Sequence, residues 1–182
     1  MAKLNIVAFS GSLRVASTNT GLLRAIKEIA GDAMNITIID IGSLPLYNQD
    51  LEATSFPAVA NTIKSQIRAA DGIIIATPEF NRSIPGVLKN LIDWTSRPYG
   101  DDSWSGRPVA VVGASLGPIA TALAQYHLKQ ILLYLNARVM GQPEFYVGSS
   151  SEKFDKDGNL TDEKTKEYIK RLIEKFETFI KK

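Results

Sequence analysis

The stretch that decides the fold is Gly72-Ile73-Ile74-Ile75-Ala76-Thr77, which continues into Pro78-Glu79-Phe80-Asn81. Its apolar residues form an unbroken run rather than an alternating one, which indicates a strand buried on both faces. Such strands occur where helices cover both sides of a parallel sheet. The stretch therefore predicts an α/β fold with a polar loop after this strand.

Four further strand-like runs lie on either side of it, and helical patterns separate them. The expected strands are 4–9, 35–41, 72–77, 109–114 and 138–147, and residues 42–57 are expected to be irregular. Two expected helices are centred on 22–29 and 59–67, and two more span 85–96 and 119–135. A fifth helix is expected to begin near Thr161, whose hydroxyl is the expected N-cap. The alternation predicts one domain over residues 1–182, a flavodoxin-like doubly wound five-stranded parallel sheet in the order 2-1-3-4-5 with helices on both faces.

The composition excludes several kinds of chemistry. The 182 residues include no cysteine, which excludes disulfides, thiolate metal sites and a catalytic thiol. With His127 as the single histidine, neither a metal site nor a Ser–His–Asp triad is expected. The 21 Lys and Arg against 19 Asp and Glu leave a formal charge of +2, which argues against nucleic acid as a partner. Chemistry in such a chain is expected to come from a group that it binds.

The beginning of the chain reads as the start of a strand. It lacks the pattern of a signal peptide, and no apolar run approaches the roughly 18 residues of a membrane span. We therefore expect a cytoplasmic protein without a membrane partner.

The loop after the first strand carries a set of hydrogen-bond donors. In a sheet of this order, ligands bind outside the carboxyl ends of the strands, near the switch point between strands one and three. This loop offers Ser12, Leu13, Arg14, Ser17, Thr18 and Asn19 just before a helix. Side-chain donors and the N–H groups of a helix start suit a phosphate monoester. The alternative is that Ser17, Thr18 or Asn19 only caps the helix.

Two other loops should meet it at the same edge. The loop of Pro78, Glu79, Phe80 and Asn81 is stiffened by proline at both ends, so its N–H groups could bond the edge of a flat heterocycle. The loop after the fourth strand supplies Ser115 and Gly117, a weaker pattern because Ser and Gly are common after strands. Ordinary turns remain the alternative for both loops.

Two motifs are similar to those of the NAD(P)H-dependent FMN reductase family, which includes bacterial quinone and chromate reductases. They are Gly11-Ser12-Leu13-Arg14-x-x-Ser17-x-Asn19 and Pro78-Glu79-Phe80-Asn81-x-Ser83-Ile84-Pro85-Gly86, the latter continuing through Asp93-Trp94 to Pro98. The resemblance implies a flavodoxin-like fold, bound FMN, NADPH or NADH as co-substrate, and a homodimer or homotetramer. It places Ser12, Arg14, Ser17 and Asn19 around the FMN phosphate. It places residues 78–81 and Ser115 beside the isoalloxazine ring.

The chain departs from the family pattern at three places. Phe80 stands where relatives usually have Tyr, Ala120-Thr121 replaces Gly-Gly, and Leu123 replaces an Arg common in relatives. These changes affect the substrate and the subunit contacts that we expect more than they affect FMN binding.

The resemblance implies an enzyme whose reactive group is the flavin. Hydride would pass from nicotinamide C4 to flavin N5 and the electrons onward to a quinone, flavin, chromate or similar small oxidant, by a ping-pong mechanism without a catalytic side chain. His127 falls on the apolar stripe of helix 119–135 and is expected in the core or at an interface. Tyr126, Leu133 and Tyr134 lie off that stripe, which favours a homo-oligomer. A non-enzymatic flavodoxin-type electron carrier or a flavin-binding sensor is the alternative.

Overall fold

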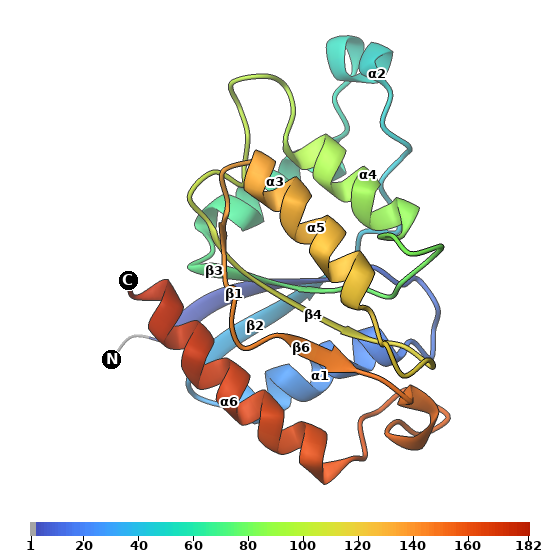
Figure 1. The fold of residues 1–182 in the computed structure, drawn as a ribbon. Helices are drawn as coiled ribbons and strands as arrows, with labels where there is room; N and C mark the ends of the chain where they lie inside the picture. The colour runs from blue at the N-terminus through green and yellow to red at the C-terminus, as the bar shows by residue number, and fades with distance from the viewer. Residues whose placement is uncertain (1–2) are drawn as a thin grey trace.

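A computed structural model describes residues 3–182 and shows one parallel sheet with helices on both faces (Figure 1). In chain order the elements are β1 (Leu4–Ser10), α1 (Thr18–Ala30), β2 (Met34–Ile39), α2 (Gln49–Thr54), α3 (Ala58–Ala69), β3 (Gly72–Ala76), α4 (Gly86–Thr95), β4 (Pro108–Ala114), α5 (Ala122–Tyr134), β5 (Arg138–Val139), β6 (Phe145–Val147), the 3-10 turn Ser150–Glu152 and α6 (Glu163–Ile180). The strand order is β2-β1-β3-β4-β5, with β6 also paired to β4. The predicted fold and strand order are confirmed.

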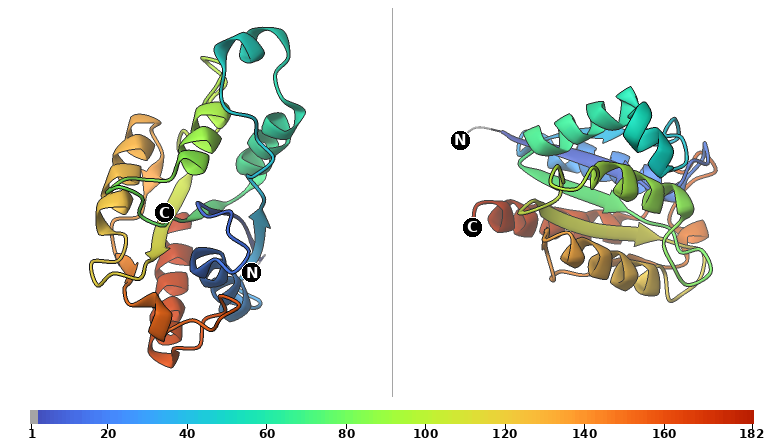
Figure 2. Two further views of the ribbon diagram at one scale, coloured as in Figure 1. Left: turned by 90° about the vertical axis from the view of Figure 1, so that its right-hand side faces the viewer. Right: turned by 90° about the horizontal axis from the view of Figure 1, so that it is seen from above.

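The sheet separates two hydrophobic cores. Ile73 and Ile75 of β3 face α3, α4 and α5, whereas Ile74 and Ala76 face α1 and α6, as the alternation of a strand requires. Figure 2 (left) shows these two groups of helices on opposite sides of the sheet. Each buried isoleucine contributes roughly 1.5–3 kcal/mol, so β3 stabilises both layers.

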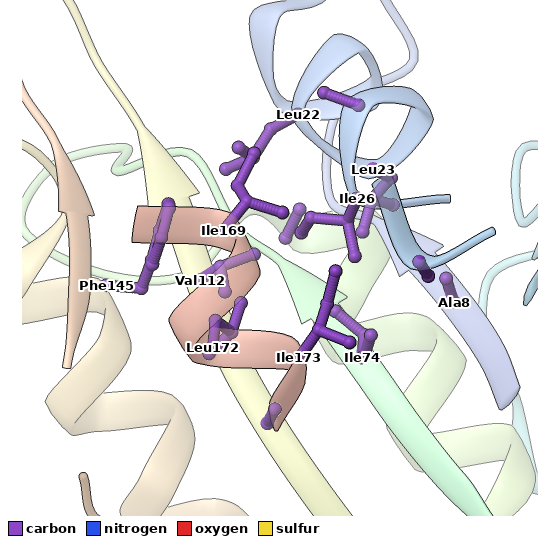
Figure 3. Packing of buried hydrophobic residues seen from close by; sticks show 14 of the residues in the cluster. Ala8, Leu22, Leu23, Ile26, Ile74, Val112, Phe145, Ile169, Leu172 and Ile173 are labelled. Atoms are coloured by element: carbon purple, nitrogen blue, oxygen red, sulfur yellow. The ribbon is translucent and has the colours of Figure 1, made fainter. Parts of the chain in front are cut away.

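The core that contains Ile74 and Ala76 is formed where α1 and α6 pack against the middle strands of the sheet. Figure 3 shows Ile74 and Val112 of the sheet opposite Ile169 and Ile173 of α6. The two helices also pack on each other, with Leu22 beside the residues of α6. This packing holds the start of α1 at the carboxyl edge of the sheet.

Three predicted boundaries were wrong. The expected fifth strand 138–147 is two short strands, because Pro143 has no N–H to donate to a ladder. Helix α5 begins at Ala122 rather than near 119, since Ala120 has a φ of 57° and cannot continue a right-handed helix. The N-cap of α6 is Asp162, whose carboxylate accepts from the N–H of Thr165 at 2.8 Å, and not Thr161.

Residues 42–57, expected to be irregular, contain the short helix α2. Its N-cap Asn48 accepts from the N–H of Asp50 at 2.9 Å. Glu52 in α2 accepts from Arg97 at 2.8 Å and from the Tyr47 hydroxyl at 2.5 Å. The segment is therefore bonded to the end of α4.

A buried lysine joins α3 to the loop that follows α4. Lys64, 2% exposed, donates to Asp101 Oδ2 at 2.7 Å and to the carbonyl of Arg97. Arg68 donates to the same carboxylate. The hydrogen bond from Lys64 is the main reason that the pKa of Asp101 lies below its usual range.

We expect Asp101 to make stability depend on pH in acid. Because its pKa is lower in the folded state, the unfolded chain binds the proton first, and its contribution is lost as pH falls below about 4. Asp101→Asn should flatten the acid side of the stability curve, measured by urea unfolding from pH 7 to pH 3. An unchanged acid limb in the variant would contradict this account.

No helix among residues 3–182 is long and apolar enough to cross a membrane.

Candidate cofactor site

The first and third loops are in contact because of one glycine. The N–H of Gly11 donates to the carbonyl of Ala76 at 2.8 Å, which ties the ends of β1 and β3 together. A Cβ on Gly11 would lie 2.9 Å from Pro85 Cγ and 3.0 Å from Pro78 Cδ. Only glycine fits without displacing these prolines, so the two loops form one surface.

The first loop presents a free cation in front of α1. Leu13 and Arg14 are exposed, Ser12 is half-buried, and Ser12 Oγ accepts from the N–H of Arg14 at 3.4 Å. Within residues 3–182 the guanidinium of Arg14 has no ion-pair partner. It is thus available to an anion.

The helix start behind this loop is capped as one alternative predicted. Ser17, 1% exposed, accepts from the N–H of Thr20 at 3.3 Å and is the N-cap of α1. Thr18 follows it, half-buried, as the first helical residue. The N–H groups of this first turn point out of the helix end, where the helix dipole favours negative charge.

Asn19 has a different position from the one expected of a phosphate donor. Its side chain is 3% exposed, donates to the carbonyl of Ala114 at 2.9 Å and accepts from the N–H of Ala114 at 2.9 Å. Both ends of the carboxamide therefore bond to the end of β4. In this structure Asn19 joins α1 to the sheet.

The third loop is a tight, rigid turn. The N–H of Phe80 donates to the carbonyl of Ser83 at 3.0 Å, and Ser83 donates back to Phe80 at 2.9 Å. Between them Asn81 and Arg82 have φ values of 50° and 64°, the pair of positive values typical of a type I′ turn. Within the described part of the chain, no hydrogen bond engages the N–H groups of Glu79, Asn81 and Arg82. The turn thus offers free backbone donors on a fixed frame.

Glu79 fixes this turn to helix α5. Its Oε2 accepts from the N–H groups of Leu123 and Ala124, each at 3.1 Å, and its Oε1 accepts from Arg82 at 3.1 Å. Thr121, the N-cap residue of α5, makes no side-chain cap bond, so the carboxylate from a distant loop replaces it. The Glu79 side chain, 7% exposed, therefore holds the third loop in position against α5.

A second bond joins the same elements. Ser83 Oγ lies 2.7 Å from Nδ1 of His127. His127 is exposed in this chain, which excludes the core from the two places expected for it and leaves the interface as a prediction.

The fourth loop closes a pocket against the third. Ser115 Oγ accepts from the N–H of Gly117 at 3.2 Å, and the Ser115 N–H donates to Val147 at 3.0 Å. A pocket of about 320 Å³ lies between the two loops and is lined by Glu79, Asn81, Arg82, Ser115, Gly117 and Ala120 among others. A Cβ on Gly117 would come no closer than 3.9 Å to another residue, so the structure itself does not require glycine there.

The backbone of Ala120 is strained. Ala120, 5% exposed, holds the left-handed conformation with a φ of 57°. That conformation destabilises a non-glycine residue by about 1–2 kcal/mol, which is more than the burial of one methyl group stabilises the fold.

Replacing Ala120 by glycine should therefore stabilise the protein. We expect Ala120→Gly to raise the free energy of unfolding by about 0.5–1 kcal/mol, measured by urea denaturation. Ala124→Gly, inside α5, is the control and should lower it by about 1 kcal/mol. A destabilised Ala120→Gly protein would show that packing of the methyl outweighs the strain.

Two features of the site were not predicted from the sequence: the place of Arg82 in the pocket and the partners of Glu79. Arg82 lines the pocket with a side chain 67% exposed, but it stands at a position that the motif leaves open. The bond from Glu79 to α5 spans 44 residues and leaves no local pattern. An acidic residue in a loop and a helix lacking its own cap were the only hints.

The residues present fit FMN at this edge. A free guanidinium and a helix start face a possible phosphate, and free N–H groups on a rigid turn face a possible ring edge. Phe80, 55% exposed, and Leu116, 73% exposed, add apolar surface for a planar group.

Comparison with known proteins shows which family the chain belongs to. Residues 4–152 match the model of the family described as NADPH-dependent FMN reductase. The chain is 43% identical over 178 residues to a 2-hydroxy-1,4-benzoquinone reductase of Burkholderia, covering 98% of this chain and 97% of the relative. It is 40% identical to a quinone reductase of Escherichia coli, covering 99% and 97%.

A solved structure is similar over the whole fold. FerB, a flavoenzyme NAD(P)H:(acceptor) oxidoreductase of Paracoccus denitrificans, superposes with a TM-score of 0.90 at 39% identity, covering 98% of this chain and 97% of that one. The cofactor and co-substrate expected from the sequence, FMN and NAD(P)H, are confirmed at the level of the family. The chain belongs to the NADPH-dependent FMN reductase family and is an oxidoreductase.

Proposed function

We propose that the protein binds FMN at loops 10–19, 78–83 and 115–120 and transfers electrons from NADPH or NADH to quinones and similar small oxidants. The observation that carries this proposal is the contact of the first and third loops through Gly11, which puts the loop before α1 and the rigid turn with its free N–H groups on one surface. The names of the relatives, which include quinone reductases, support the choice of oxidant. Free flavins and chromate belong to the same proposal as further acceptors.

The phosphate would be held by the first loop. Arg14 supplies the unpaired charge, Ser12 a hydroxyl, and Ser17 and Thr18 the helix start. Asn19 contributes indirectly, since its bonds to Ala114 fix α1 against the fourth loop.

The ring would be held by the third and fourth loops. The free N–H groups of Glu79 and Asn81 would bond its polar edge, while Pro78 and Phe80 supply apolar contact and Ser115 and Gly117 the opposite wall. Glu79 keeps its carboxylate on α5, so its part in ring binding is made by the backbone.

The chain supplies positioning rather than proton transfer. When bound, FMN supplies the redox chemistry, accepting hydride from the nicotinamide and passing electrons to the oxidant. Among the described pocket residues, the one carboxylate is occupied by α5 and Arg82, and none is a histidine. We therefore assign no catalytic side chain. With the ring between the third and fourth loops, nicotinamide and oxidant would use its open face in turn, which is the ping-pong scheme of this proposal.

The test is steady-state kinetics on FMN-loaded protein. With NADPH or NADH and 1,4-benzoquinone varied together, the proposal predicts parallel double-reciprocal lines. Turnover with intersecting lines would contradict the ping-pong scheme. Protein that takes up FMN but oxidises neither nicotinamide, whatever the acceptor, would favour an electron carrier or flavin-binding sensor instead.

We also propose that the working unit is a homodimer or homotetramer joined through α5. Leu123, Tyr126, Leu133 and Tyr134 are 47–85% exposed on this helix, and Phe80 and Ile119 continue the apolar surface beside the pocket. Apolar side chains gathered at this density usually mark an interface.

If α5 forms the subunit contact, a charge placed on it should change the oligomeric state, whereas a charge placed elsewhere should not. Light scattering after gel filtration should give the wild type at least twice the mass of one chain, whereas Leu133→Glu should dissociate it by placing a charge in the interface. Leu46→Glu is the control, because Leu46 is 83% exposed but belongs neither to α5 nor to the apolar surface beside the pocket. A monomeric wild type would contradict the proposal.

A further inference from the structure

A second and larger cavity lies between β6 and α6. It measures about 570 Å³, and its lining residues come from segments 143–147, 153 and 162–171, none of them in the three cofactor loops. Figure 1 shows β6 running beside α6, and Figure 3 shows Phe145 near Ile169 and Leu172 in the core. The cavity therefore has a rigid floor, and its size is that of a small-molecule site.

The charges around this cavity are unbalanced. Lys153, Lys164 and Arg171 line it, and none of them has an ion-pair partner within residues 3–182. The two acids of the lining are already engaged. Glu144 pairs with Lys129 at 3.2 Å, and Asp162 accepts from the N–H and hydroxyl of Thr165 at 2.8 and 2.6 Å. Asp162 keeps its negative charge, because these hydrogen bonds and the nearby charges of Lys153 and Lys164 lower its pKa. With Glu144 paired to Lys129, three cations face one carboxylate, so the net charge of the lining is positive.

One wall of the cavity suits a flat ring. Lys164, Tyr168 and Arg171 recur at helical spacing, so they lie on one face of α6. Tyr168 is 47% exposed, and the Arg171 guanidinium lies 5.9 Å from its ring centroid. A planar ligand on this face would contact an aromatic ring and a guanidinium together.

The opposite wall is the outer edge of the sheet. β6 has β4 on one side only, with Tyr146 opposite Gly113. In a parallel ladder the N–H and C=O of alternate residues point to opposite sides, and the Val147 carbonyl points to β4, where it accepts from Ser115. Tyr146 thus turns its own N–H and C=O toward the cavity, as a donor and an acceptor side by side.

We propose that this cavity is a second ligand site, for a planar heterocycle that carries a phosphate monoester, such as a nucleoside monophosphate. The ring lies against Tyr168 with its polar edge on the backbone of Tyr146, and the phosphate is bound by Lys164, Arg171 and Lys153. This site is independent of FMN binding and of the proposed reaction.

The test is calorimetric titration with AMP of protein that holds one FMN per chain, after excess FMN has been removed. Adenosine and inorganic phosphate are titrated separately, because adenosine has only the ring and phosphate has only the anion that the site is proposed to bind. We expect AMP to bind at least about tenfold more tightly than either half. Lys164→Ala and Arg171→Ala should each weaken AMP binding by about tenfold while leaving FMN content unchanged.

Lys175→Ala is the matched control. Lys175 is exposed on α6, has no ion-pair partner in the described chain and does not line the cavity, so AMP affinity should stay unchanged. Retained circular dichroism shows that the variants are folded. Absence of AMP binding would overturn the proposal, as would phosphate binding as tight as AMP or equal weakening by Lys175→Ala.

Discussion

Arg14→Ala should raise the dissociation constant of FMN by about 10- to 100-fold. A hydrogen-bonded charge on a phosphate is worth about 1.5–3 kcal/mol, and each 1.4 kcal/mol is about a factor of ten. Arg14 has no ion pair in the described chain, so its removal breaks no contact that stabilises the apoprotein. Flavin fluorescence quenching measures the affinity.

The control for Arg14 is Lys27→Ala. Lys27 is exposed in the last turn of α1. Its loss changes the net charge as much as the loss of Arg14 does, but at the helix end opposite the proposed phosphate site. If both variants weaken FMN to the same extent, the effect is one of overall charge. Unchanged FMN affinity in Arg14→Ala would place the phosphate elsewhere.

Glu79→Ala is expected to affect both stability and cofactor binding. It leaves the N–H groups of Leu123 and Ala124 without their acceptor, and Ala124 is fully buried. Loss of a helix cap costs about 1–2 kcal/mol, so the free energy of unfolding should fall by that amount. FMN should dissociate faster, because the turn that carries the free N–H groups is no longer bonded to α5.

Glu79→Gln separates the two roles of this carboxylate. The amide oxygen still accepts from α5, but the charge that pairs with Arg82 and favours the helix start is gone. We expect most of the stability to return, as measured by urea unfolding, and FMN release to stay near the wild-type rate. Loss of stability equal to that of Glu79→Ala would show that charge, not the hydrogen bonds, fixes the turn.

The layers of the fold were predictable because burial leaves a pattern in the sequence. The unbroken run at Ile73–Ile75 requires helices on both faces, and the crossover rule then left few strand orders. Strand ends were not predictable in the same way. Pro143 divides the expected fifth strand, and the positive φ of Ala120 delays α5, because local backbone geometry overrides apolar periodicity at both places.

The loops of the candidate site were predictable from their place after buried strands, but the partners of their side chains were not. Asn19 was expected to face a phosphate, and it bonds instead to Ala114, 95 residues away. Glu79 likewise has partners on a distant helix. The hydrogen-bond partners of a polar side chain are the donors and acceptors that the fold brings near it. A local sequence motif does not contain that information.

Anaerobic titration of the FMN-loaded protein with NADPH tests the central claim most directly. The account predicts that one equivalent of NADPH bleaches the visible flavin absorbance and that 1,4-benzoquinone then restores it, without any partner protein. A protein that binds FMN with an absorbance unchanged by NADPH and NADH would contradict it.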